Sequence, residues 1–383
     1  MKYQFLIFFS IVLIVYSAVN FYIYSRASQG LPSGSTIKLW FGWTFLFLSS
    51  TYIAGRVLEK FYLSVFSDVL TWIGSFWLAF MLYGFLLVVL IDLVRIINGF
   101  TGFLPAGFFT SNAKQWMFVM GISVIFITVA AGYINAISPR IKVMELTVNK
   151  SAGNLKDLKI AMASDIHMGT LIGPKRTSKL VKSLNELKPD IILLAGDIVD
   201  EDLAPVIKQN LGECLKQLYA PFGVYGITGN HEYIGGAESA VKYLEDNGII
   251  MLRDTVIQLN NSFYLAGRED RDKNRFSGRK RLEVRELFQN IDTNLPVILL
   301  DHQPFELDKA AEAGVDLQLS GHTHHGQLWP LNYLTRAIYE VSMGYKKKGD
   351  AHFYVSPGFG GWGPPVRTGN RPEVVFITLT FNK

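Results

Sequence analysis

The 383-residue chain contains a single cysteine, Cys214. One cysteine excludes an intramolecular disulfide and fits a reducing compartment. The chain also lacks internal repeats and low-complexity tracts, which excludes a repeat architecture. Whatever stabilises the fold must therefore come from burial and from ordinary polar contacts.

Charge is scarce in the first 138 residues, which contain seven of the 37 lysines and arginines and three of the 32 acidic residues. The rest of the chain holds 30 basic and 29 acidic residues and is nearly neutral. The formal net charge of +5 therefore comes mainly from short segments of the first part. A nucleic-acid-binding domain needs an excess of positive charge, so we expect no nucleic-acid partner.

Four nearly charge-free segments lie in this first part, each close to the roughly 20 residues that cross a hydrocarbon core. They span residues 5–24, 37–55, 69–91 and 116–136. We therefore expect a transmembrane domain over residues 1–138 with four helices, followed by a soluble domain over residues 139–383. A cleaved signal peptide is the alternative for the first segment, but no clear cleavage site follows it.

Four spans place both ends of the chain on one side of the membrane. The basic residues beside the spans divide five to four between the two sides, which favours a cytoplasmic soluble domain only weakly. We expect a multi-pass protein of a bacterial inner or cell membrane. Asp92 and Arg95, near the end of the third segment, are three residues apart and can pair at the interface.

From about residue 140 the pattern is that of a soluble α/β domain. Short apolar runs alternate with amphipathic stretches, which predicts buried strands with helices packed outside them. The expected strands are 158–164, 191–195, 223–228, 296–300 and 315–319. The expected helices are 174–188, 203–218, 237–247 and 280–290.

Potential metal ligands follow five successive predicted strands. Open α/β sheets bind ligands at the carboxyl ends of their strands, so these five loops should meet in one crevice. Asp, Asn and Gly are also ordinary turn residues, but that alternative does not account for six of the seven histidines lying in these loops. The motifs are Asp165-Ile-His167, Gly196-Asp-Ile-Val-Asp200, Gly229-Asn-His-Glu232, Asp301-His-Gln-Pro304 and Ser320-Gly-His-Thr-His-His-Gly-Gln327.

His322 and His324 are two residues apart where the last of these strands ends. In an extended segment this spacing directs both rings to one side, which suits two neighbouring metal ions. A neutral imidazole is the commonest protein ligand of transition metals.

With these motifs the chain resembles the calcineurin-like binuclear metallophosphoesterases over about residues 140–383. It is most similar to a membrane-associated branch with a Gly-His-Thr-His motif and a glycine-rich tail like residues 354–360 and 363–367 here. That branch includes transmembrane metallophosphoesterases and hydrolases of UDP-2,3-diacylglucosamine. The resemblance implies an α/β fold of four layers, with two mixed sheets face to face and helices outside.

The resemblance implies two divalent metal ions. We expect Mn²⁺. Fe, Zn²⁺, Co²⁺ and Mg²⁺ are alternatives, because a mixed set of nitrogen and oxygen ligands does not discriminate among these ions. A shared Asp197 would hold the ions about 3.5–4 Å apart, with a bridging hydroxide for in-line attack on phosphorus. The implied ligands are Asp165, His167, Asp197 and His324 for the first ion, and Asp197, Asn230, His302 and His322 for the second.

The resemblance also assigns proton transfer to His231 and its orientation to Asp200, for which a helix N-cap is the alternative. Glu232 is expected to be structural. His325 stands where the branch has glycine, and either contacts substrate or is a tolerated substitution. Arg268 and Arg367 are further candidates for substrate binding, Arg367 through a phosphate clamp.

We therefore expect a membrane-anchored metallophosphoesterase that hydrolyses a phosphodiester or pyrophosphate. Four spans are more than a tether needs, so we expect a phosphorylated lipid or nucleotide-lipid substrate at the bilayer, in lipid metabolism. Two alternatives are a broad-specificity phosphodiesterase or phosphatase on soluble substrates, and a membrane scaffold or sensor with an accessory metallophosphoesterase domain. The sequence does not predict the oligomeric state.

Overall fold

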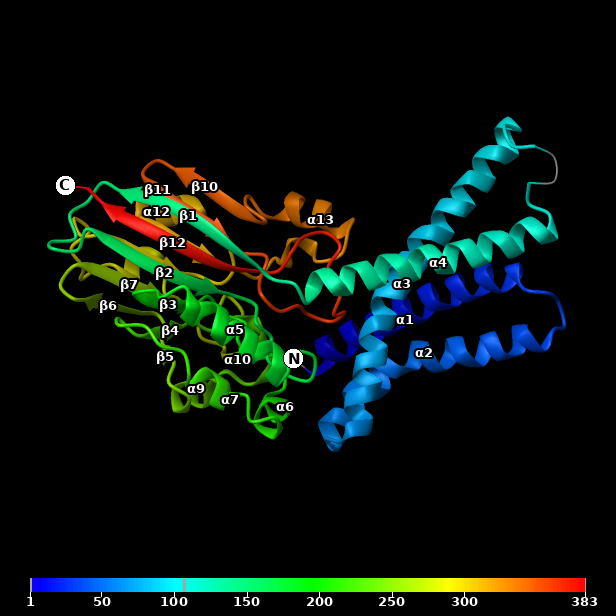
Figure 1. Ribbon diagram of the computed structural model, residues 1–383, viewed down its shortest axis with the longest axis horizontal. Coiled ribbons are helices and arrows are strands. Elements are labelled where there is room, and N and C mark those ends of the chain that lie inside the picture. The colour runs from blue at the N-terminus through cyan, green and yellow to red at the C-terminus, as the bar shows by residue number, and fades with distance from the viewer. Residues whose placement is uncertain (1, 106–107, 383) are drawn as a thin grey trace. The chain divides into compact units, whose positions relative to one another are not determined.

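The computed structural model describes residues 2–105 and 108–382 (Figure 1). The chain divides into two compact units, Met1–Gly132 and Tyr133–Lys383. Each unit is described separately below.

The first unit consists of long helices joined by short loops. Ser35 caps α2 through its side chain, and Ser64 begins α3 with a capping box shared with Ser67. Gly102 ends α3 in the left-handed conformation, with φ +60°. The elements are α1 (Lys2–Ala27), the 3₁₀ turn η1 (Ser28–Gly30), α2 (Thr36–Phe61), α3 (Val65–Thr101) and α4 (Ser111–Ala136).

Three of these helices are long and apolar enough to cross a membrane: Phe9–Gly30, Val65–Thr101 and Asn112–Ala136, within the described residues. The expected second span, 37–55, is helical as part of α2, but α2 is not apolar enough to count as a candidate span. The expected count of four is thus corrected to three candidate spans. The physical reason is the composition of α2, which combines Lys38, Arg56, Glu59 and Lys60 with several hydroxyl residues.

The helices α2 and α3 pack closely through glycine. A Cβ added at Gly74 would lie 2.2 Å from the backbone nitrogen of Tyr52, and one added at Gly55 would lie 2.6 Å from that of Thr71. Close backbone approach over small residues is typical of helix pairs in membranes. The polar α2 is therefore packed tightly against the most apolar helix of the unit.

The second unit contains two six-stranded mixed sheets. The first sheet has the order β1 (Arg140–Val148), β12 (Glu373–Phe381), β2 (Asp157–Ala163), β3 (Ile191–Leu194), β4 (Val224–Gly226) and β5 (Ile250–Met251). The second has the order β10 (Gly344–Lys348), β11 (Ala351–Val355), β9 (Leu317–Ser320), β8 (Val297–Leu300), β7 (Phe263–Gly267) and β6 (Thr255–Leu259).

Most neighbouring strands are parallel. The antiparallel pairs are β12 with β2, β10 with β11, and β6 with β7. The helices of this unit are α5 (Pro174–Glu186), α6 (Leu203–Lys208), α7 (Gly212–Leu215), α8 (Asn230–Gly235), α9 (Ala237–Asp246), α10 (Lys273–Ser277), α11 (Val284–Leu287), α12 (Leu307–Glu312) and α13 (Leu331–Ile338). The expected helix 203–218 is divided into α6 and α7, and the expected helix 280–290 is reduced to α11.

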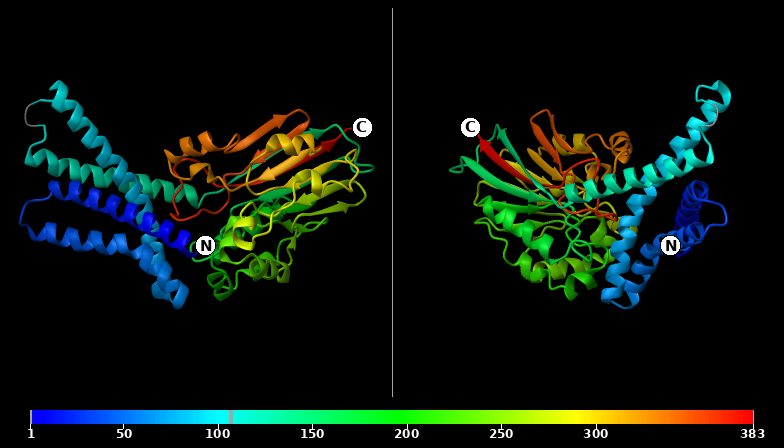
Figure 2. Two further views of the ribbon diagram at one scale, coloured as in Figure 1. Left: turned by 180° about the vertical axis from the view of Figure 1, so that it is seen from behind. Right: turned by 45° about the vertical axis from the view of Figure 1, so that its right-hand side comes forward.

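Side chains that alternate along the strands build three cores. In β2, Ile160 and Met162 pack with residues of the second sheet, whereas Ala161 and Ala163 face the core that contains α5 and α9. The outer face of the second sheet packs against α11 and α12. The result is the expected four-layer order of helices, sheet, sheet and helices, which Figure 2 shows from two further sides.

Candidate dimetal centre

The implied metal ligands lie in the loops at the carboxyl ends of β2, β3, β4, β8 and β9. Several of them have left-handed backbone conformations, with φ of 48° at Asp165, 52° at His167 and 50° at Asp197. His322 and His324 have φ of 71° and 44°. Non-glycine residues adopt this region at a cost and often at functional sites, where the surrounding structure enforces it.

Asp165, His167 and His324 form the first group, and one ligand atom of each lies within 4.8 Å of the others. The Nε2 atoms of His167 and His324 are 3.1 Å apart. His324 Nε2 is 3.5 Å from Asp165 Oδ1. Two imidazole nitrogens and a carboxylate therefore converge on one point.

Asp197, His302 and His322 form the second group. Asn230 joins it, because its Oδ1 lies 2.7 Å from His322 Nδ1. The Nδ1 of His302 lies 2.8 Å from the carbonyl oxygen of Ala195, which can accept its proton. That contact fixes the ring and leaves Nε2 directed at the site.

Asp197 connects the two groups. Its Oδ1 accepts the backbone N–H of His231 at 2.9 Å. Its Oδ2 lies 3.1 Å from His302 Nε2 in the second group and 3.9 Å from His167 Nε2 in the first. The second oxygen is thus available to both groups.

The side chains fit a pair of divalent ions. Asp165 Oδ2 is buried and has no hydrogen-bond partner among the described residues, which is costly for a carboxylate without a cation. His167 and His324 direct two ring nitrogens at each other, an arrangement that a shared ion would stabilise. Carboxylate, imidazole and amide oxygen form a donor set suited to transition-metal ions.

The protonation of His322 and His324 is consistent with this fit. Burial, together with the positive charge of His302, lowers the pKa of His322 to about 3. Burial, His167 and Arg367 hold the pKa of His324 well below its ordinary value. Both imidazoles are therefore neutral at pH 7, as a metal ligand must be.

The two buried aspartates create a negative potential. Burial lowers the pKa of His302, but Asp197 and Asp165 outweigh it and raise that pKa well above the ordinary value. For Asp197 itself, burial is outweighed by His302 and His231, which hold its pKa well below the usual range. The centre therefore attracts positive charge.

His231 lies beside both groups without belonging to either proposed ligand set. Its Nδ1 is 3.1 Å from Asp200 Oδ1, and its ring centroid is 4.5 Å from that of His167. Burial lowers the pKa of His231, but Asp197, Asp200 and Glu201 outweigh it and raise that pKa to about 9. His231 is therefore an imidazolium at neutral pH.

Glu232 has a larger part than the sequence indicates. Its buried carboxylate accepts the backbone N–H groups of Asp197 at 3.1 Å, Val199 at 2.9 Å and Gly229 at 2.7 Å. One side chain thus joins the loops after β3 and β4, which carry Asp197 and Asn230. The only sequence signal for this role of Glu232 is its place beside His231 in the Asn-His-Glu motif.

The three candidates for substrate contact are all buried and bonded to protein groups. Arg268 donates to Asp301 Oδ2 at 2.8 Å, and Arg367 donates to the carbonyl oxygen of Pro357 at 2.8 Å. His325 has φ 46°, in the region glycine favours, and its Nδ1 is 2.9 Å from Ser342 Oγ. These contacts account for all three residues as structural groups, and substrate contact stays a prediction for them.

Aromatic side chains flank the centre on two sides. The Trp362 ring is 6.1 Å from that of His231, and the Tyr339 ring is 6.0 Å from that of His322. The Phe305 ring is 4.8 Å from that of Tyr339 and tilted by 43° to it, and the guanidinium of Arg271 lies 4.5 Å from the centre of the Phe305 ring. Sequence reasoning missed Tyr339 and Phe305, because their proximity to the centre depends on tertiary contacts.

The calcineurin-like phosphoesterase family model matches residues 158–326, which include all five ligand motifs. An uncharacterized metallophosphoesterase of Aquifex aeolicus is 35% identical over 225 residues, covering 58% of this chain and 85% of the relative. A zebrafish (Danio rerio) transmembrane protein with metallophosphoesterase domain is 30% identical, covering 68% of this chain and 62% of the relative.

An uncharacterized metallophosphoesterase of Campylobacter jejuni is 27% identical over 99% of this chain and its own whole length. The family accounts for a dimetal centre built from the two residue groups described above. The chain belongs to the calcineurin-like phosphoesterase family and is a metallophosphoesterase with apolar helices long enough to span a membrane.

Proposed function

We propose that the protein is a membrane-anchored phosphoesterase that hydrolyses a phosphodiester or pyrophosphate bond of a lipid-linked substrate. The observation that carries the proposal is the position of Asp197 Oδ2, within 3.9 Å of His167 Nε2 and 3.1 Å of His302 Nε2. One carboxylate oxygen between two ligand groups is the arrangement that a two-ion hydrolase requires.

Asp165, His167, Asp197 and His324 would hold one ion, and Asp197, Asn230, His302 and His322 the other. When bound, the two ions supply Lewis acidity, which lowers the pKa of water and neutralises charge on the phosphoryl oxygens. We propose Mn²⁺ as the native metal. Elemental analysis of the protein purified without added metal tests this, and a stoichiometric amount of zinc or iron instead would reject it.

His231 would donate a proton from its Nε2 atom. Asp200 holds the opposite ring nitrogen at 3.1 Å and so fixes the ring and keeps the imidazolium charged. The Nε2–H can then donate to a phosphoryl oxygen or protonate the leaving-group oxygen.

The apolar face of α13 supports a substrate at the bilayer surface. Leu331, Leu334 and Ile338 lie on one side of this helix and are 40%, 59% and 54% exposed. Helices with such a face bind in the plane of a membrane interface. The helix packs against the histidine loop, because a Cβ added at Gly326 would lie 2.4 Å from the backbone nitrogen of Asn332.

The basic residues in segments 268–281 and 346–348 do not carry the lipid proposal, because several of them pair with acidic side chains. Lys273 pairs with Asp254 at 2.9 Å, Arg281 with Asp301 at 2.7 Å, and Lys346 with Glu340 at 2.6 Å. Phe359 is buried in the core that contains α5 and α9 and therefore does not contact acyl or sugar groups of a substrate. Trp362 is 51% exposed beside His231, and we propose that it contacts such groups.

The test compares kcat/KM for an acylated substrate in mixed micelles with that for its deacylated head group. We use UDP-2,3-diacylglucosamine, the leading candidate, and a phospholipid diester as the second. Leu334→Gln should lower the micellar value about tenfold and leave the soluble one unchanged, because α13 loses apolar area. Ile250→Gln, on the half-exposed edge strand β5, is the matched control.

Equal kcat/KM values for acylated and soluble substrates in the unmodified protein would reject the lipid proposal and favour the broad-specificity phosphodiesterase. Absence of hydrolysis with two metals bound would favour the scaffold or sensor. We prefer the enzyme because each implied ligand and His231 lie together at the centre.

We further propose that the catalytic unit is cytoplasmic. The single cysteine, Cys214, supports this, because a free thiol fits a reducing compartment. In a Cys214→Ser background, Tyr219→Cys, at a position that is 73% exposed, should react with a membrane-impermeant maleimide only after intact bacterial cells are permeabilised. Reaction in intact cells would reject the proposed orientation.

A further inference from the structure

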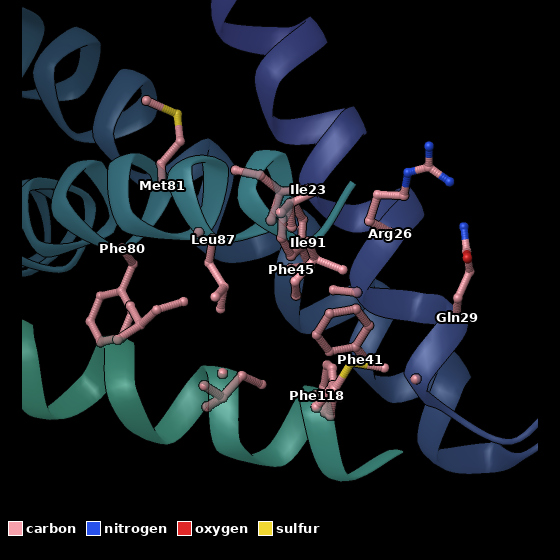
Figure 3. A pocket seen from close by; sticks show the side chains of 18 of the residues that line it. Ile23, Arg26, Gln29, Phe41, Phe45, Phe80, Met81, Leu87, Ile91 and Phe118 are labelled. Atoms are coloured by element: carbon pink, nitrogen blue, oxygen red, sulfur yellow. The ribbon is translucent and has the colours of Figure 1, made fainter. Parts of the chain in front are cut away.

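The first unit contains a cavity of about 300 Å³ between its helices. That volume is at the lower end of the roughly 300–1,000 Å³ typical of small-molecule pockets. Figure 3 shows Phe41, Phe118 and Leu87 along its wall, with Phe80 towards one end and Arg26 and Gln29 at the other. The cavity is therefore apolar along its length and polar at one end.

The polar end carries excess positive charge. Arg26, Arg95 and Lys114 line it together with the single acidic residue Asp92. Asp92 is already shared, because its Oδ2 is 2.8 Å from Arg26 Nε and its Oδ1 is 3.4 Å from Arg95 Nη1. Tyr22 also donates its hydroxyl to Asp92 at 2.6 Å.

Lys114 has no ion-pair partner in the part of the chain that the structure describes. One carboxylate thus faces three cations, all within candidate membrane spans. All three lie near the ends of these spans, where basic side chains can reach the anionic head groups of lipids. An anionic ligand at this end of the cavity would compensate the excess positive charge.

We propose that this cavity binds one membrane phospholipid with an anionic head group. Its phosphate would contact Lys114, Arg26 and Arg95, and an acyl chain would lie along Phe41, Phe118 and Leu87. The apolar wall requires a chain and the cationic end requires an anion, so neither a free phosphate nor a neutral lipid satisfies both. This site is separate from the proposed hydrolysis and does not depend on it.

The test is lipid titration of the full-length protein in mild detergent, followed by native mass spectrometry. The probes are palmitoyl-oleoyl phosphatidylglycerol, the phosphatidylcholine of the same chains, and glycerol phosphate as the head group without chains. We expect one tightly bound phosphatidylglycerol, weaker phosphatidylcholine and no displacement by glycerol phosphate. Equal affinity for the two lipids, or displacement by glycerol phosphate, would overturn the proposal.

Two variants locate the site. Lys114→Gln should weaken phosphatidylglycerol binding about fivefold, the usual effect of one basic residue at an anionic lipid, and leave phosphatidylcholine unchanged. Leu87→Trp should weaken both lipids by filling the cavity. Lys38→Gln, in the first turn of α2 and outside the lining, is the matched control.

All three variants should retain hydrolysis of a soluble chromogenic phosphodiester, which verifies the fold of the second unit. Helical circular dichroism and size-exclusion elution in detergent like those of the unmodified protein verify the fold of the first unit. If Lys114→Gln and Lys38→Gln weaken phosphatidylglycerol equally, the cations act only as general surface charge and the cavity is not the site. If Leu87→Trp folds and binds lipid normally, the acyl chain does not occupy the cavity.

Discussion

At the scale of single residues, Asp197 is the position on which the centre depends most. Asp197→Asn keeps the shape of the side chain but removes the charge of the oxygen that lies between the two ligand groups. We expect loss of most bound metal and of hydrolysis. Elemental analysis and turnover of a chromogenic phosphodiester measure both, and two retained ions with a normal rate would contradict the assignment.

His231 should behave differently from the ligands. His231→Ala removes the imidazolium next to Asp200 but no member of either ion's ligand set, so two ions should stay bound. The kcat value should fall by about 10²–10⁴-fold, the usual effect of a positioned acid or base. Metal loss in this variant would instead make His231 a ligand.

At the scale of elements, Glu232 on α8 joins the loops after β3 and β4 by accepting three backbone N–H groups. Glu232→Gln turns one acceptor into a donor that faces an N–H group. We expect about 10–100-fold weaker metal binding and about 1–3 kcal/mol lower stability. Metal titration and denaturant unfolding measure these changes.

The control for Glu232 is Glu286→Gln. Glu232 accepts the backbone N–H of Gly229, three residues before it, and Glu286 accepts that of Glu283 in the same way at the start of α11. Glu286 is exposed and far in sequence from the proposed ligands. It should change metal affinity little. Equal effects of the two substitutions would show that the capping interaction, and not the bridge between ligand loops, is responsible.

The sequence predicted the elements whose signals are local. The strands β2, β3, β4 and β8 could be predicted, because buried strands are short continuous patterns. The side chains predicted as ligands after them lie together in the structure, and their role as ligands stays a prediction. The helix expected over 280–290 was not reliable. There Arg281 instead reaches Asp301, and the carbonyl of Leu282 accepts from Arg268, contacts between segments that no local pattern encodes.

At the scale of the whole molecule, the second unit has its own cores and includes the last turn of α4. Asn135 donates to the carbonyl oxygens of Arg367 at 2.8 Å and Asn370 at 2.7 Å. A chain that begins at Tyr133 should therefore fold, bind two ions and hydrolyse a soluble phosphodiester at the full-length rate. It should keep the part of its preference for a micellar substrate that α13 provides, because α13 lies in this unit. An unfolded or metal-free product would contradict this prediction.

The order of the first sheet has a consequence for biosynthesis. The strand β12 lies between β1 and β2, with Val143 beside Phe376 and Ile160 beside Ile377. The ribosome must therefore make residues 373–381 before β1 can join the sheet, whereas the apolar helices are made long before. Contacts between such distant segments form slowly. The nascent chain is thus held at the membrane while its catalytic half is still open, which favours protection by a chaperone during this interval.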